Sequence, residues 1–138
     1  MSKAKSQMEI SVAEVVDHMK LTGSFSPALA QVVQRKVTAE AARKNGIRVT
    51  ASELQKAADV FRIDQGLFKA SDTEAWLKSQ GISTEALEDW LETNMLIYKF
   101  KSQLERGGSQ KKYLSSASVK ATVRELAYQD WLAKAMSR

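Results

Sequence analysis

Apolar residues recur along this chain at the spacing of α-helices, and capping signals divide them into segments. The spacing predicts six helices, over residues 11–20, 26–45, 50–65, 71–80, 83–106 and 119–136. The second of them repeats an apolar residue at every fourth position, namely Leu29, Val33, Val37 and Ala41. We expect these four residues to form the stripe that packs on the rest of the protein.

The starts and stops of these helices follow known capping chemistry. A serine or threonine followed three residues later by glutamate can satisfy two free backbone N–H groups at a helix start. The pattern occurs at three of the predicted starts, with the pairs Ser11 and Glu14, Thr50 and Glu53, and Ser71 and Glu74. Pro27 after Ser26 fits a first helical position, and glycines at 46 and 81 fit helix ends.

The last two helices contain most of the large apolar residues. Residues 83–106 place apolar side chains on more than one stripe, so we expect this helix at the centre of the packing. The final helix has an apolar side formed by Val119, Val123, Leu126, Ala127 and Trp131, with Tyr128, Leu132 and Met136 beside it. Clean two-residue alternation with β-branched residues is absent from the sequence, so the predicted fold class is all-α.

The length of 138 residues fits one domain of ordinary size. Within it we expect a disordered tail over residues 1–8 and a helical body over 9–106. A Gly- and Ser-rich linker over 107–118 would follow, and then a returning helix over 119–136. This helix would pack back on the body or on a second copy of the chain.

Composition excludes several classes of active site. The chain has no cysteine and a single histidine, His18, which leaves no thiol nucleophile, histidine triad or two-histidine metal site. We therefore expect no catalytic residues, no metal and no cofactor.

No apolar run is long enough to span a membrane, and the polar start lacks the apolar stretch of a signal peptide. These features predict a cytoplasmic protein.

The net charge of +5 suggests nucleic acid as a partner. Residues 99–138 have nine Lys and Arg against three acids, a balance of +6, whereas residues 1–98 have twelve against thirteen, a balance of −1. The positive charge is spread over helix, linker and helix, and no tight helix-turn-helix pair presents clustered residues that could contact base edges. This distribution disfavours direct recognition of DNA or RNA.

The remaining distinctive feature is the number of large apolar side chains. Core packing explains most of them, but some can line a groove for an unfolded or amphipathic segment of another chain. The candidate groove residues are Trp76, Met95, Tyr98, Phe100, Tyr128 and Trp131. The alternatives are a scaffold in which the last helix swaps into a homodimer, and a basic protein that binds nucleic acid.

Roughly residues 25–105 resemble the N-terminal chaperone region of SurA-like proteins, which belong to the parvulin-type peptidyl-prolyl isomerase family. The resemblance rests on an ordered set of short motifs: Glu53-Leu54-Gln55, Asp59, Phe61-Arg62, Gly66-Leu67, Asp72-Thr73, Trp76-Leu77, Gly81, Ser83 and Leu87-Glu88. In that family the helical region continues into a parvulin domain, and a C-terminal helix then returns to it. The segment Glu125-Leu126 to Trp131-Leu132 is similar to this returning helix.

The resemblance implies a chaperone module that holds unfolded polypeptide. A parvulin domain needs about a hundred residues, whereas only fourteen, 105–118, separate Leu104 from Val119. The implied activity is therefore client binding without prolyl isomerisation. Relatives of this kind also suggest a setting in peptide maturation or export.

Overall fold

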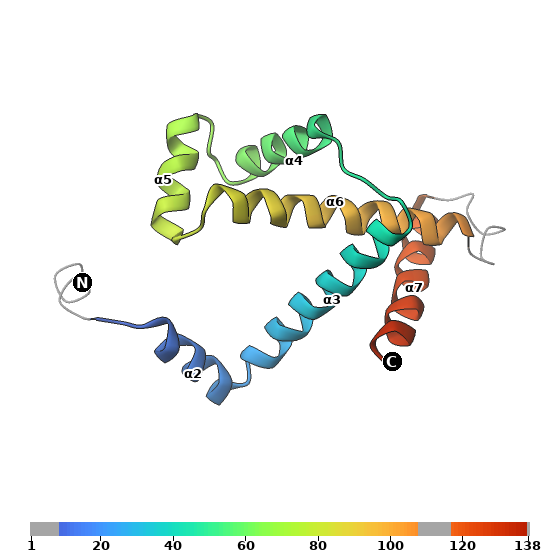
Figure 1. The fold of residues 1–138 in the computed structure, drawn as a ribbon, viewed down its shortest axis with the longest axis horizontal. Coiled ribbons are helices and arrows are strands. Elements are labelled where there is room, and N and C mark those ends of the chain that lie inside the picture. Colours follow the sequence, from blue (N-terminus) through green and yellow to red (C-terminus); the bar gives the residue numbers. More distant parts are fainter. Residues whose placement is uncertain (1–8, 108–116, 138) are drawn as a thin grey trace. The chain divides into compact units, whose positions relative to one another are not determined.

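The computed structural model of the chain describes residues 9–107 and 117–137, and every regular element within those residues is an α-helix (Figure 1). The six helices are α2 (Val12–Thr22), α3 (Phe25–Lys44), α4 (Ala51–Asp64), α5 (Ala70–Gln80), α6 (Thr84–Gly107) and α7 (Ala117–Met136). The prediction of an all-α fold with about six helices is confirmed. The tail predicted at 1–8 and the central part of the predicted linker, 108–116, lie outside the described residues.

Contacts along the chain define two compact units, Met1–Gln34 and Arg35–Arg138. The first contains α2 and the beginning of α3. The hydroxyl of Ser11 accepts a hydrogen bond from the backbone N–H of Glu14 at 3.1 Å, which supports the predicted start of α2. No residue of α2 is buried, and the helix ends where Gly23 adopts a positive φ of 82°.

The second unit contains the hydrophobic core, which forms where the end of α3, the C-terminal half of α6 and α7 meet. Its centre consists of Ala39, Ala42, Leu96 and Phe100, and Trp131 packs against this cluster. The rings of Phe100 and Trp131 meet edge to face, with centroids 4.8 Å apart. Helix α7 therefore packs back on the body of the same chain, which was one of the two arrangements predicted.

The buried face of α3 differs from the predicted stripe. Leu29 and Val33 are exposed, whereas Thr38, Ala39 and Ala42 are buried. Alanine and threonine allow α3 to come close to the bulky Leu96 and Phe100, so small side chains occupy this contact. Helix α3 also begins at Phe25, which places Pro27 within the first turn, where its missing N–H costs no hydrogen bond.

The buried face of α7 differs from the prediction at one position. Leu126 is exposed, whereas Val123, Tyr128 and Leu132 are buried. The helix turns its Tyr128 side inward because the hydroxyl of Thr38 lies 3.0 Å from the hydroxyl of Tyr128. Burial of a phenol requires such a partner, and α3 provides it.

Helices α4 and α5 begin by related mechanisms. The capping box predicted at Thr50 and Glu53 is present, with both reciprocal hydrogen bonds made. Helix α5 has Lys69 at its N-cap, two residues before the predicted cap, and the carboxylate of Asp72 accepts from the backbone N–H of Lys69 at 3.1 Å. The predicted cap residue Ser71 therefore lies inside the helix.

None of the helices in residues 9–107 and 117–137 combines the length and the hydropathy that a membrane span requires.

Candidate functional site

An apolar groove of about 650 Å³ lies between α4 and α6. Helix α4 contributes one wall with Ala57, Val60 and Phe61. Helix α6 contributes the other wall, in which Leu91 and Met95 are four residues apart and therefore share one face. Trp90 and Asn94 form a second row beside them on α6, and Glu53, Lys56 and Asp64 complete the lining with charged groups.

An aromatic cluster closes one side of this groove. The ring of Phe61 meets that of Trp76, from α5, edge on at 5.5 Å between centroids. The same Phe61 ring meets Trp90, from α6, at 6.1 Å and a similar angle. Trp90 is still 47% exposed and Val60 58% exposed, so the groove presents apolar surface to solvent. Exposed aromatic side chains in a concave site are typical of surfaces that bind other apolar groups.

Arg35 holds Trp90 in place from the α3 side. Its guanidinium lies 5.3 Å from the centroid of the Trp90 ring, a cation–π distance. The same group donates hydrogen bonds to the carbonyl of Trp90 at 3.2 Å and to Oδ1 of Asn94 at 2.6 Å. Partial burial lowers the pKa of Arg35. Arg35 therefore contacts both the ring and the backbone of Trp90 and joins the groove wall on α6 to α3.

Glu53 fixes the charge at the edge of the groove. Its carboxylate accepts from Nζ of Lys99, at 2.7 Å, and from the backbone N–H of Thr50, at 2.9 Å. These hydrogen bonds lower the pKa of Glu53 to about 2, so the group is ionised at neutral pH. The pair joins the start of α4 to α6 and therefore holds the two walls together at this end.

The six residues predicted to line a groove do not form one surface. Met95 lines the α4–α6 groove, and Trp76 supports it through Phe61. Phe100, only 2% exposed, and Tyr128 are core residues. Trp131 packs on the core and lines a separate hollow between α3 and α7, and Tyr98 lies exposed on α6.

Sequence reasoning missed Val60, Phe61 and Trp90 as groove residues. Phe61 and Trp90 are large apolar residues of the third and fifth predicted helices. Nothing in a single sequence distinguishes a half-exposed aromatic residue from a core one.

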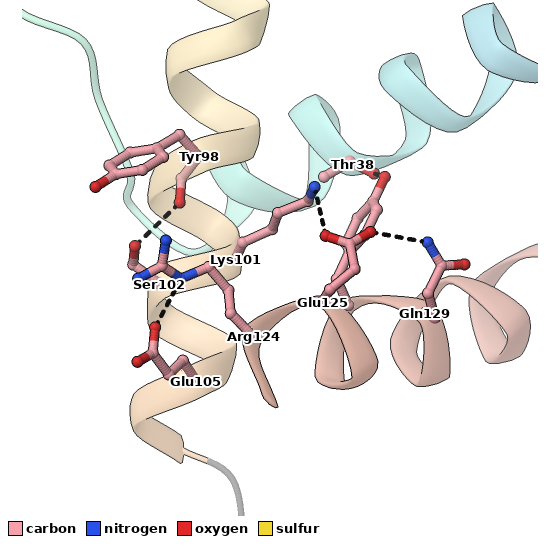
Figure 2. Close-up of polar contacts among 9 residues, drawn as sticks. Thr38, Tyr98, Lys101, Ser102, Glu105, Arg124, Glu125 and Gln129 are labelled. Atoms are coloured by element: carbon pink, nitrogen blue, oxygen red, sulfur yellow. Dashed lines mark hydrogen bonds and ion pairs between the residues drawn. The ribbon is translucent and has the colours of Figure 1, made fainter. Parts of the chain in front are cut away.

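Three of the six basic residues that the structure describes from residue 99 onward are paired with acids, namely Lys99, Lys101 and Arg124. Figure 2 shows two such pairs between α6 and α7: Nζ of Lys101 with Glu125 at 3.0 Å, and Nε of Arg124 with Glu105 at 2.7 Å. Hydrogen bonds from Gln129 and Lys101 lower the pKa of Glu125. The hydrogen bond to Glu105 raises the pKa of Arg124. These charges join α7 to α6 and are not a free basic surface.

Comparison with known families identifies the helical region. Residues 3–101 match the family described as the SurA-like N-terminal domain. The chain belongs to this family. The resemblance inferred from the motifs of α4 to α6 is thereby confirmed, and α7 lies beyond the matched residues. No curated protein and no solved structure matches the chain.

Proposed function

We propose that this SurA-like helical module binds unfolded or extended polypeptide in the α4–α6 groove and holds it without covalent chemistry. The observation that supports this proposal is the groove itself, in which Val60, Phe61, Trp90 and Met95 offer apolar and polarisable contacts. The half-exposed Trp90 leaves apolar surface in water, which is unfavourable. Such a residue gains free energy when an apolar client side chain covers it.

The chemistry of the lining favours binding over catalysis. The charged groups of the groove lie at its edge, and Glu53 is engaged by Lys99. Among residues 9–107 and 117–137, no cluster of His, Asp and Glu could hold a metal ion. We propose adsorption of apolar segments as the activity, and we expect no prolyl isomerisation. A cytoplasmic location, and a setting in peptide maturation or export, stay predictions.

The two alternatives are less well supported. Ion pairs engage three of the nine C-terminal cations, Lys99, Lys101 and Arg124, and the other six are spread along the sequence without a compact DNA-reading motif. The packing of α7 on its own body removes the need for a swapped homodimer to bury that helix. Self-association stays a prediction, which light scattering across a range of protein concentrations would test.

The proposal is tested with variants on one helix. Val60→Asp places a charge inside the groove, whereas Ile63→Asp places the same charge at a similarly exposed position of α4 that does not line it. We expect the wild-type chain to bind labelled peptides rich in leucine and phenylalanine and to delay aggregation of an unfolded reference protein. Val60→Asp should weaken peptide binding by about tenfold or more, since burying an unpaired carboxylate is costly.

Ile63→Asp should change the affinity by less than about twofold. Circular dichroism and a thermal melt of both variants establish that each is folded. Absence of peptide binding by the wild-type chain, or equal losses in the two variants, would contradict the proposed function.

A further inference from the structure

A second hollow, of about 400 Å³, lies beside the C-terminal half of α6 and the segment that joins α3 to α4. Its lining is more polar than that of the α4–α6 groove, and it consists of Ile47, Arg48, Tyr98, Lys99, Ser102 and Arg106. Three of these six side chains are cationic, and none is acidic. The composition of the lining therefore points to an anionic ligand.

The wall formed by the joining segment is fixed by hydrogen bonds. Gly46, with a φ of 78°, turns the chain out of α3, and the N–H of Ile47 then donates to the carbonyl of Ala42 at 3.0 Å. Nζ of Lys99 donates to the carbonyl of Arg48 at 2.7 Å and so ties this segment to α6. The backbone at Arg48 is consequently positioned before any ligand arrives.

The charges around the hollow do not cancel. Lys99 is paired with Glu53, and Arg124, which lies next to the hollow over Tyr98, is paired with Glu105. Both nearby acids are therefore already neutralised. Within residues 9–107 and 117–137, Arg48 and Arg106 make no ion pair. Two guanidinium groups thus remain available at the two sides of one hollow.

Tyr98 gives the hollow an apolar surface next to these cations. Its ring is 57% exposed, and the guanidinium of Arg124 lies 5.6 Å from the ring centroid. Nε of Arg124 donates to Oε2 of Glu105 at 2.7 Å, a contact that Figure 2 shows. Ile47 adds a half-buried aliphatic side chain from the joining segment.

We infer that this hollow binds a carboxylate of the client polypeptide together with an adjacent apolar side chain. Arg48 and Arg106 would donate to the carboxylate, since guanidinium groups match its planar geometry. The neighbouring apolar side chain would lie on Tyr98 and Ile47. The carboxylate can belong to an Asp or Glu side chain or to a chain terminus. This inference rests on the proposed function and adds a charge preference to it.

The test uses three peptides with the same leucine and phenylalanine residues. The first contains glutamate beside phenylalanine and has an amidated C-terminus, and the second replaces that glutamate with glutamine. The third has glutamine and a free C-terminal carboxylate after phenylalanine.

Affinities are measured by fluorescence anisotropy on the full chain, for the wild type and for the double variant Arg48→Gln and Arg106→Gln. The matched control, Lys36→Gln with Lys78→Gln, removes the same charge from exposed positions outside the hollow.

We expect at least one carboxylate peptide to bind the wild type about three- to tenfold more tightly than the amidated glutamine peptide. The Arg48 and Arg106 double variant should lose this preference and keep its affinity for the glutamine peptide. The lysine control should keep the preference. Preference for the glutamate peptide identifies a side-chain carboxylate as the ligand, and preference for the third peptide identifies a chain terminus.

Equal binding of all three peptides by the wild type would overturn the inference while leaving the proposed function intact. Equal losses in the double variant and the lysine control would also overturn it, because net charge would then explain the preference. If no peptide binds at all, both the inference and the proposed function are wrong.

Discussion

The two halves of α6 differ in how completely their apolar side chains are covered. Toward its C-terminus, Leu96 and Phe100 are enclosed by α3 and α7. Toward its N-terminus, Trp90 and Met95 face α4 across an open groove. Both halves have large apolar residues at helical spacing, so side-chain type does not explain the difference. The apolar cover over each half does, since Phe61 of α4 and the guanidinium of Arg35 leave Trp90 47% exposed.

This comparison indicates where the chain derives its stability and where it can bind a partner. A side chain covered by two helices has its free energy of burial already realised in the folded state. A side chain that is still half-exposed, such as Trp90, can gain further free energy of burial when a ligand covers it. The closed half of α6 should therefore respond to mutation with a change in stability, and the open half with a change in affinity.

The largest expected effect is the loss of the core phenylalanine. Phe100→Ala should lower the free energy of unfolding by about 3–5 kcal/mol, because it leaves a cavity beside Trp131. Trp90→Ala should cost about half as much, because nearly half of that side chain is already exposed. Urea denaturation of both variants measures the difference. Equal losses would mean that the two halves of α6 are covered to the same degree.

A smaller effect is expected where polar groups close the core. Tyr128→Phe removes the hydroxyl that lies 3.0 Å from the Thr38 hydroxyl and should cost about 0.5–1.5 kcal/mol. Tyr98→Phe is the matched control, because this ring is exposed and its contact with Arg124 needs no hydroxyl. We expect the control to lie within about 0.5 kcal/mol of the wild type. A comparable loss in both variants would contradict a specific role for the Thr38–Tyr128 contact.

The smallest effect concerns the ion pair at the edge of the groove. The pKa of Glu53 is about 2 in the folded chain, below its ordinary value of 4.5, so its carboxylate stabilises the fold above pH 4.5. This contribution should disappear as the pH falls from about 5 toward 2. In Glu53→Gln, unfolding midpoints in urea should be lower at pH 7 and decline less toward pH 3 than in the wild type. Glu9→Gln, an exposed control, should follow the wild-type pH profile.

The local structure of this chain was largely predictable from short-range chemistry. The capping box of Thr50 and Glu53 and the stop at Gly81 lie where the sequence placed them. The cap of α5 lies two residues before the predicted Ser71, because Asp72 accepts a hydrogen bond from the backbone of Lys69. Such errors arise where two local hydrogen-bonding solutions are close in energy.

The candidate site was predictable only in part. Met95 and Trp76 were named from their type, and the structure places them in or behind the α4–α6 groove. Phe100 and Tyr128 were named on the same grounds and are core residues. Arg35, which orders the groove wall, is 55 residues from Trp90 along the chain. No local pattern indicates a contact at that separation.

The sequence by itself determined the helices, their caps and the membership of the SurA-like N-terminal domain family, because each depends on residue types at short spacing. The tertiary structure decided which apolar faces are closed. Small residues at Ala39 and Ala42 let α3 approach α6, and α7 then covers Phe100, while the α4 side stays open around Trp90. Burial depends on how many neighbouring helices meet a face, which is a property of the assembled chain.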